Sequence, residues 1–476
     1  MLEITLIMFN FVSVVCKFQH ILEIMKIRKI KWKDHPILGN LELDFLNPAT
    51  HKPYSTIIFV GENGSGKTTI LETINTFLCM GSFSPFEYIE YEVGDNLFKA
   101  IPMPESEIDS FYKRVDIASG AITEIRSNKT YKLQSIQQDI KDPRYYGSLL
   151  SKPRSDYKTS KITSSTSLEL DKNKYDQDDN DDFTTLKQLM VDIQSEDNDT
   201  YREINQDRNK KGELPMPEDE FETISKMHRF KNAFNTFFEK IKYDKVTKSN
   251  GEKLIIFSKN GKDISLDNLS TGEKQIVFRG AFLLKNLNQL SGSIIMVDEP
   301  ELSMHPKWQE RILDYYKNLF TDNEGNQFAQ LIFASHSTGV ISSALKDLDN
   351  TKVFILQTDD AGAIIPGHIV RPSVLPYTLA AEINYQAFNV ASTDYHNALY
   401  GYIEAEGWLP LFKSQPYPTE TYIKLNKDGS TTPQNISLSE KIRHIIHHPE
   451  NQNNNYTEEQ LKESIDRMRI FIMAQP

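Results

Sequence analysis

Residues 59–69 read FVGENGSGKTT and match the phosphate-binding pattern G-x-x-x-x-G-K-[ST] at every fixed position. A loop of this kind wraps a polyphosphate with backbone N–H groups, so Gly61, Gly64 and Gly66 stand where a Cβ would obstruct the close approach. The residues before the loop are β-branched or aromatic and predict a buried strand, and the residues after it predict a helix. Strand, loop and helix in this order are the setting of a P-loop, which the sequence therefore predicts.

The P-loop predicts a site for ATP and Mg²⁺. Lys67 is expected to reach the β- and γ-phosphates, and Thr68 is expected to offer its hydroxyl to the metal. The helix that follows directs the positive end of its dipole at the anion. The residues expected to hold the nucleotide here are Gly61, Glu62, Asn63, Gly64, Ser65, Gly66, Lys67, Thr68 and Thr69.

Length and composition limit the classes of protein. A chain of 476 residues predicts two or three domains, because a single core rarely grows that large. The net charge of −12 argues against a surface covered in basic patches, although it is compatible with a local basic groove for DNA or RNA. The two cysteines, Cys16 and Cys79, are too few for a disulfide framework or a zinc site. They predict a reducing compartment, the cytoplasm.

The first 24 residues have two interpretations. Residues 5–16 are apolar like the core of a signal peptide, but Glu3 stands where such a peptide carries positive charge, and the run is too short to span a bilayer. No membrane location is therefore expected. Because an alternating strand begins at Met25, residues 1–24 are either an extension upstream of the true start or an additional helix or strand.

The division into domains follows from changes in periodicity. Residues 25–32 and 39–45 alternate and predict two strands ahead of the P-loop strand. Residues 156–211 are polar and acidic, which predicts an insertion that is partly helical and partly disordered, and residues 221–243 predict an amphipathic helix with aromatic core residues. The expected divisions are an N-terminal extension at 1–24, a first lobe at 25–80, the insertion at 81–245, a second lobe at 246–372 and a helical module at 373–476.

Two strands in the second half end in residues that suit catalysis. Residues 293–300 form an apolar run that ends in Asp298 and Glu299, and residues 330–337 form another that ends in His336. Ligand sites of α/β sheets lie at the carboxyl ends of their strands. We therefore expect these side chains to share one site with the P-loop.

A third motif opens a helix. Residues 269–275 read LSTGEKQ, in which Ser270 is placed to cap the helix and Gly272 would allow a phosphate to approach closely. Alone, this motif indicates only a helix start.

Taken in order, the P-loop, the LSTGE motif, the strand with two acids and the strand with the histidine resemble the core motifs of the ATP-binding-cassette (ABC) ATPases. Residues 301–306, ELSMHP, are typical of the soluble SMC/RecF-like and OLD-like branch, whose bacterial members include ATPase subunits of anti-phage systems. The resemblance spans residues 25–370, apart from the insertion. It implies an α/β fold: an ABC-type P-loop NTPase head with a mixed sheet, an inserted largely helical segment and a small helical C-terminal module.

The resemblance also implies roles for the strand-end residues. Asp298 would hold Mg²⁺ through its water shell, and Glu299 would orient or deprotonate the attacking water. His336 would contact the γ-phosphate and stabilise the charge that develops there.

The resemblance further implies a site shared between two copies. The signature residues Ser270, Gly272 and Glu273 would meet the ATP that is bound by a second copy, so that ATP joins the two head to tail. A glutamine usually senses the γ-phosphate in this family, and its candidates here are Gln134, Gln137 and Gln138.

The last hundred residues change from strands to helices. The expected elements are helices at 380–391 and 393–406, a polar loop at 413–434, and two helices that begin at capping boxes, Ser437 with Glu440 and Thr457 with Gln460.

Arg443 and His448 have an R-x4-H spacing that resembles the active motif of HEPN-family ribonucleases, in which the arginine holds the scissile phosphate and the histidine is an acid or base. His447, one helical turn from Arg443, is an alternative histidine. Equally compatible is a solvated helix end whose basic residues complement the helix dipole.

Three functions are therefore compatible with the sequence. In the first, the chain is an ATPase sensor that restrains a separate effector nuclease, as in Septu-like or retron-linked systems. In the second, it carries its own ribonuclease, like the anticodon nucleases that join such an ATPase to a HEPN-like end. The third, a RecF-like or SMC-like DNA-repair ATPase, would lack the helical C-terminal module.

Overall fold

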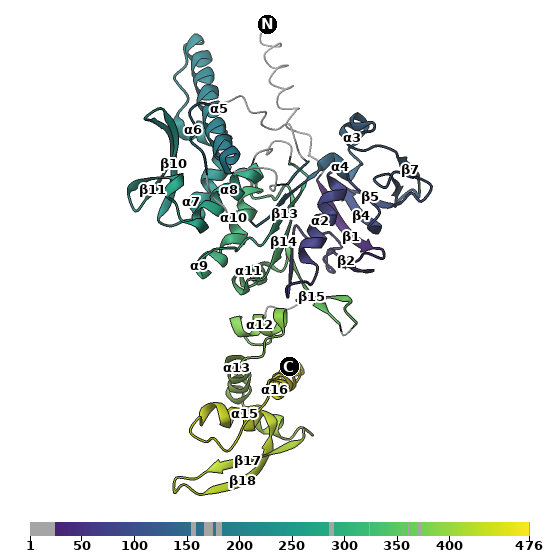
Figure 1. The fold of residues 1–476 in the computed structure, drawn as a ribbon, viewed down its shortest axis with the longest axis vertical. Helices are drawn as coiled ribbons and strands as arrows, with labels where there is room; N and C mark the ends of the chain where they lie inside the picture. The colour runs from purple at the N-terminus through teal and green to yellow at the C-terminus, as the bar shows by residue number, and fades with distance from the viewer. Residues whose placement is uncertain are drawn as a thin grey trace. The chain divides into compact units, whose positions relative to one another are not determined.

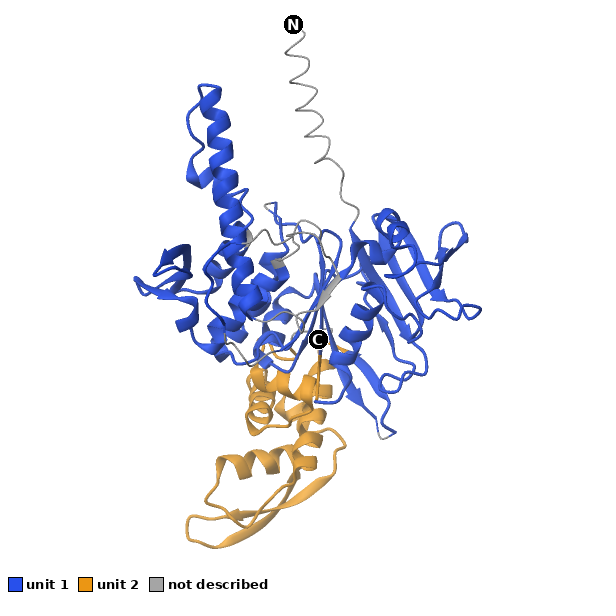
Figure 2. Ribbon diagram, turned by 45° about the horizontal axis from the view of Figure 1, so that its top comes forward, with its two compact units in different colours: residues 1–59, 63–367 blue, residues 60–62, 368–476 orange. Residues whose placement is uncertain are grey.

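The computed structural model describes residues 24–153, 159–165, 175–177, 183–284, 290–322, 324–359, 361–369 and 373–475. The chain divides into two compact units (Figure 2), unit 1 with residues 1–59 and 63–367, and unit 2 with residues 60–62 and 368–476. The apolar run at 5–16 and much of the polar stretch at 156–182 lie outside the described residues. Within the described ranges, no helix has the length and apolar composition needed to cross a membrane.

The central sheet has seven strands, β3 (Thr56–Gly61), β8 (Ser148–Ser151), β9 (Tyr175–Gln177), β13 (Ile294–Asp298), β14 (Gln330–Ser335), β15 (Thr351–Thr358) and β16 (Ile364–His368), in the order β16-β15-β3-β14-β13-β8-β9. β13 runs parallel to both β14 and β8. The Leu331 N–H donates to the Ser55 carbonyl at 2.9 Å, so β3 and β14 begin at the same edge. The three strands predicted to end in functional residues are neighbours, and the α/β class is confirmed.

A second sheet of six antiparallel strands has the order β2-β1-β4-β5-β6-β7. The strands β1 (Met25–Trp32) and β2 (Glu42–Asp44) were predicted. The others lie within the stretch 81–245, which we expected to be an insertion, and they extend the sheet that β1 begins. They are β4 (Phe86–Val93), β5 (Asn96–Pro102), β6 (Tyr112–Asp116) and β7 (Ile122–Ile125).

Helix α2 (Lys67–Leu78) joins the two sheets. Its buried side chains, such as Ile70 and Phe77, belong to one core cluster with residues of both sheets. Trp32 Nε1 on β1 also donates to Thr73 Oγ1 at 3.1 Å. Figure 1 shows α2 on one side of β13 and β14. The helix that begins at the P-loop is therefore fixed by packing on two faces.

Other helices cover the opposite side of the central sheet in Figure 1, chiefly α8 (Thr271–Leu284) and α10 (Ile312–Leu319). The remaining elements of unit 1 are α3 (Leu133–Gln138), α4 (Pro143–Tyr146), α5 (Phe183–Lys210), α6 (Glu218–Glu222), α7 (His228–Phe237), β10 (Ile241–Ser249), β11 (Glu252–Lys259), β12 (Lys262–Ser265), α9 (Pro306–Gln309) and α11 (Thr338–Ala344).

The single helix predicted at 221–243 is wrong, because this stretch contains the end of α6, all of α7 and the start of β10. Phe230 and Phe234 are buried as predicted, whereas Ile224 is 59% exposed between the two helices. The aromatic residues of α7 pack on the β10–β11 hairpin, where Phe234 lies 5.1 Å from Phe257 between ring centroids. The spacing of these aromatic residues is explained by their packing on the hairpin and not by one continuous helix.

Unit 2 contains α12 (Ala380–Phe388), α13 (Thr393–Ala405), α14 (Leu409–Lys413), β17 (Thr419–Leu425), β18 (Thr431–Ser437), α15 (Leu438–His447) and α16 (Glu458–Met473). The core of this unit includes Ile403, Ile442 and Ile465 from α13, α15 and α16. The polar loop predicted at 413–434 is wrong, since β17 and β18 form an antiparallel hairpin there. The hairpin is mostly exposed, so its sequence lacks the apolar alternation that would have identified it.

Of the two capping boxes predicted in unit 2, one is complete. The Thr457 side chain and the Gln460 side chain cap each other's backbone N–H at the start of α16. At the start of α15, Ser437 Oγ accepts from the Glu440 N–H, but Glu440 Oε1 accepts from Lys413 Nζ at 2.7 Å. The second box is therefore a simple N-cap.

Candidate nucleotide-binding site

The P-loop connects β3 to α2 with several residues in the left-handed region of backbone space. Gly66 caps α2 with φ +83°, and a Cβ there would lie 2.6 Å from Leu38 Cδ2 and 2.7 Å from Ile364 Cδ1. Both the dihedral and the close packing require glycine at this position. Lys67 begins the helix, is 5% exposed, and donates from Nζ to Ser65 Oγ at 3.3 Å. The loop is thus formed with its lysine held inside it.

The P-loop meets the first acid of β13 directly. Thr68 Oγ1 donates to Asp298 Oδ2 at 2.9 Å, although the two residues are 230 positions apart. Burial raises the pKa of the Asp298 carboxyl, and the hydrogen bond from Thr68 opposes that rise. A hydroxyl oxygen beside a buried carboxylate is an oxygen donor set that fits Mg²⁺. Thr68 and Asp298 are therefore together, as the sequence predicted.

Glu299 follows Asp298 with an unusual backbone. Its φ is +45°, a region that costs a residue with a Cβ roughly 1–2 kcal/mol. Three hydrogen bonds hold it. Its N–H donates to the Ala334 carbonyl at 2.9 Å, and its carbonyl accepts from Arg279 Nη1 at 2.8 Å and from the Leu302 N–H at 3.2 Å. The backbone that directs the Glu299 side chain is thus fixed from both sides.

A further acid, Glu301, links the two strand ends and was not singled out by the sequence. Its Oε1 accepts from Ser335 Oγ at 2.9 Å and from the His336 N–H at 2.7 Å. Its Oε2 has no hydrogen-bond partner among the described residues, and burial raises the pKa of this carboxyl. Glu301 therefore positions the end of β14 that carries His336. In the sequence, the run DEPE at residues 298–301 contains a third acid, and this acid could have identified Glu301 as a candidate.

The signature motif begins α8 as predicted. Ser270 is exposed, its N–H donates to Glu273 Oε2 at 2.8 Å, and its Oγ accepts from the Glu273 N–H at 3.5 Å. A Cβ on Gly272 would lie 2.7 Å from the Ser303 carbonyl oxygen. Position 272 therefore requires glycine because it packs closely on Ser303, whether or not a phosphate approaches it. Ser270 remains accessible to a ligand or a second molecule.

The candidate glutamines do not occupy the end of a central strand. Gln134, Gln137 and Gln138 are exposed on α3. The strand that ends beside the acids is β8, in which Ser151 pairs with Val297.

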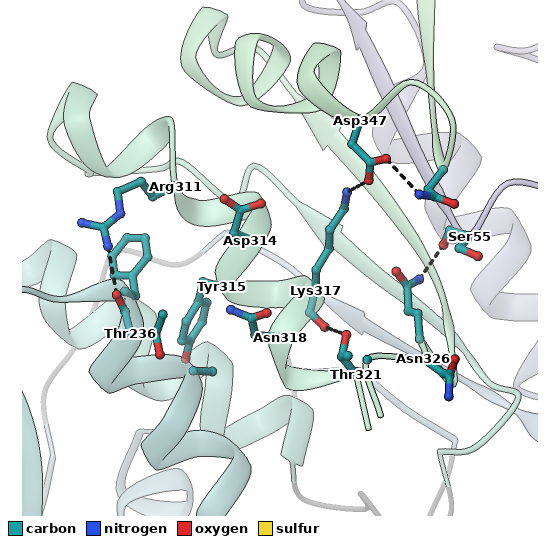
Figure 3. Close-up of a pocket in the computed structure, with 15 residues that line it drawn as sticks. Ser55, Thr236, Arg311, Asp314, Tyr315, Lys317, Asn318, Thr321, Asn326 and Asp347 are labelled. Carbon is teal, nitrogen blue, oxygen red and sulfur yellow. Dashed lines mark hydrogen bonds and ion pairs between the residues drawn. The ribbon is translucent and has the colours of Figure 1, made fainter. Parts of the chain in front are cut away.

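A cavity of about 760 Å³ lies elsewhere in unit 1 (Figure 3). Its lining includes Ser55, which precedes β3, and Gln327, which precedes β14, so it adjoins the amino ends of these strands. Arg311 in its wall donates to a carbonyl of α7 at 2.9 Å, and Lys317 pairs with Asp347 at 2.9 Å. Nucleotide sites of α/β sheets lie at the carboxyl ends, so this cavity is not the nucleotide site.

The proposed ribonuclease residues of unit 2 have separate partners. Arg443 Nη2 pairs with Glu404 at 3.1 Å, and its guanidinium lies 4.5 Å from the Tyr400 ring centroid. His448 Nδ1 lies 3.1 Å from Glu450 Oε1, and its side chain is 53% exposed. The alternative, His447, is also exposed. The contacts of Arg443 and His448 are those of a solvated helix end.

Unit 2 also contains a buried histidine, His396 on α13. It is fully buried, its Nε2 lies 3.0 Å from Ser464 Oγ, and its Nδ1 has no hydrogen-bond partner in the described part of the chain. Burial, and then the charge of Arg443, lower the pKa of His396 to about 4, so the ring is neutral. Such a residue stabilises helix packing.

The chain is similar to known proteins over the region that contains the P-loop. A family described as "AAA domain, putative AbiEii toxin, Type IV TA system" matches residues 57–342. The "Retron Vc95 probable ATPase" of Vibrio cholerae serotype O1 biovar El Tor is 25% identical over 395 residues, covering 68% of this chain and 72% of that protein.

Similar solved structures include an Smc head bound to the C-winged helix domain of ScpA, with a TM-score of 0.38, 14% identity and coverage of 72% of this chain and 98% of that one. The SMC head domain from Thermotoga maritima has a TM-score of 0.33 and 16% identity, covering 72% of this chain and all of that one. The family match spans the P-loop, both acids and His336, and the chain belongs to this family of AAA-domain P-loop ATPases.

Proposed function

We propose that this protein binds ATP with Mg²⁺ and hydrolyses it at the P-loop, acting as the sensor or regulator of a separate effector nuclease in anti-phage defence. The observation that supports catalysis most directly is the hydrogen bond of 2.9 Å between Thr68 and Asp298. It brings the loop that would bind the phosphates to the strand end that carries the proposed base.

In this proposal each residue has one task. Lys67 binds the β- and γ-phosphates, while Thr68 and Asp298 hold the metal, which neutralises charge on the phosphate oxygens when it is bound. Glu299 accepts a proton from the attacking water, so the new P–O bond forms as the bond to the ADP oxygen breaks. His336 stabilises the charge on the γ-phosphate oxygens.

The second half of the site would come from another copy of the chain. Ser270 is exposed at the start of α8, a helix of 14 residues whose first N–H groups and dipole favour an anion. In a head-to-tail pair, Ser270 and Gly272 of one copy would contact the γ-phosphate bound by Lys67 of the other. ATP would then hold the pair together.

Ser270→Arg should test the shared site. A long cation at the position of the partner's γ-phosphate should lower turnover about 10²-fold while ATP binding at the variant's own P-loop is kept. Ser392→Arg is the matched control, because Ser392 caps α13 by accepting the Tyr395 N–H at 3.2 Å. Both variants lose an N-cap, worth about 1 kcal/mol, but only the first should lose ATPase activity in a steady-state assay.

Mixing two inactive variants sharpens this test. A pair made of Lys67→Ala and Ser270→Arg chains keeps one site with an intact P-loop and an intact signature, so activity should reappear on mixing. Unchanged activity in Ser270→Arg, or no recovery on mixing, would show that residues 269–275 are only a helix start.

A separate nuclease is favoured over the alternative of a ribonuclease within unit 2. The retron relative is described as a probable ATPase, and Arg443 and His448 each contact a carboxylate of their own. The ATPase assembly would then sense the trigger, and whether it has ATP bound would decide whether it restrains the effector nuclease. DNA or RNA would reach the assembly through that effector or its trigger.

Arg443→Ala and His448→Ala should distinguish these functions. Both residues lie at a polar helix end, so each substitution should cost about 1 kcal/mol of stability or less and leave the ATPase activity unchanged. Purified unmodified protein, assayed with ATP and then with a chelator, should not cleave RNA. RNA cleavage that both variants abolish would instead establish the ribonuclease in this chain.

A further inference from the structure

Arg279 lies inside α8, nine residues after Ser270, and is 5% exposed. Its guanidinium donates to three backbone carbonyls: that of Glu299 at 2.8 Å, that of Ser151 at 3.2 Å and that of Asp298. A buried cation needs several hydrogen bonds to offset its desolvation. Here these bonds go to the ends of two strands rather than to an acid.

The three carbonyls belong to the part of the sheet where the chemistry is proposed. Asp298 ends β13 and Ser151 ends β8, so both carbonyls lie at the ends of neighbouring strands. Arg279 supplies donors to both ends at once. One side chain of α8 therefore bridges the two strand ends, next to the ladder pair of Ser151 and Val297.

The contact with Glu299 has a further consequence. The φ of +45° at Glu299 is unfavourable for a residue with a Cβ, and it determines the direction of the Cα–Cβ bond. The Ala334 carbonyl holds the N–H side of this residue, and its carbonyl side accepts from Arg279 at 2.8 Å and from the Leu302 N–H at 3.2 Å. Without Arg279, the Glu299 carbonyl would keep only the longer bond from Leu302, so this backbone conformation would be held less firmly.

We propose that Arg279 is a positioning residue for hydrolysis, which holds the backbone of Glu299 so that its carboxylate faces the attacking water. This inference rests on the proposed function of Glu299 as the base. Arg279 and Ser270 lie on the same helix, about 13 Å apart along its axis. The helix thus connects the surface proposed to meet a second copy with the base of its own chain.

Arg279→Met and Arg279→Lys test the proposal. Methionine keeps most of the volume and no donor, so kcat should fall about 10²-fold, the size of effect expected when a catalytic group is misplaced by about 1 Å. The KM and the Kd for ATP should change little, because Arg279 does not contact the P-loop side chains in the described structure. Lysine can reach one of the carbonyls, so Arg279→Lys should recover part of the rate.

Tyr315→Phe is the matched control. Tyr315 Oη donates to the Ile276 carbonyl at 2.9 Å, so this variant also removes a buried hydrogen bond to α8, but one that does not involve Glu299. If Arg279 only stabilised the fold, both variants would lower the melting temperature and both would keep kcat. We expect the loss of kcat in the Arg279 variants alone.

A double variant separates this inference from the assignment of the base. When Arg279 acts through Glu299, Arg279→Met should not slow the residual single-turnover rate of Glu299→Gln any further. An unchanged kcat in Arg279→Met, or an equal loss in both backgrounds, would overturn the inference. If Arg279→Met does not fold, Arg279→Lys gives the same comparison. Full activity of Glu299→Gln would instead overturn the assignment of Glu299 as the base.

Discussion

Glu299→Gln should bind ATP normally and hydrolyse it about 10²–10⁴-fold more slowly, the contribution usual for a positioned general base. Glutamine has the shape of glutamate and can hydrogen-bond to water, but its amide cannot accept the proton that the water releases. Its backbone contacts to Ala334 and Arg279 do not involve the side chain and should persist. The chemical step should therefore be lost without loss of the site.

The rate is best measured by phosphate release, with ATP binding measured in parallel by calorimetry. Glu310→Gln is the control, because it makes the same change at an exposed residue of the same unit. ATP should also trap Glu299→Gln as a pair of chains, visible by light scattering, since the ATP between them is not consumed. An unchanged rate of hydrolysis would mean that another group is the base.

The parts of the nucleotide site could be predicted because each is local in the sequence. The P-loop pattern needs two glycines, a lysine and a serine or threonine within eight residues. A buried parallel strand is an uninterrupted apolar run that a polar residue ends, as in β13. The strand order is not local. Thr68 meets Asp298 only because β3, β14 and β13 are neighbours in the sheet.

The residues that support the site could not be predicted for the same reason. Arg279 resembles any cation of an amphipathic helix, and its partners Asp298 and Ser151 lie 19 and 128 positions away. Glu301 was noticed as part of a family motif, but its bond to the end of β14 spans 34 positions. Periodicity reports which face of an element is buried, not which atoms that face meets.

The largest loss of binding is expected for Lys67→Ala. Lys67 is buried in the P-loop, where its ammonium group would form charge-assisted hydrogen bonds with two phosphates. Losing about 3 kcal/mol of such contacts weakens binding about 10²-fold, which abolishes binding at ordinary ATP concentrations. In the unliganded protein Lys67 donates to Ser65 Oγ at 3.3 Å, so its removal should lower the stability by only about 1 kcal/mol.

Thermal unfolding with and without ATP measures both effects at once. ATP and Mg²⁺ should raise the melting temperature of the unmodified protein, because a ligand that binds the folded state stabilises it by mass action. Lys67→Ala should have a similar melting temperature without ATP and no rise with it. The exposed Lys248→Ala removes the same charge and should keep the full rise. An equal rise in Lys67→Ala would place the nucleotide outside the P-loop and overturn the site described above.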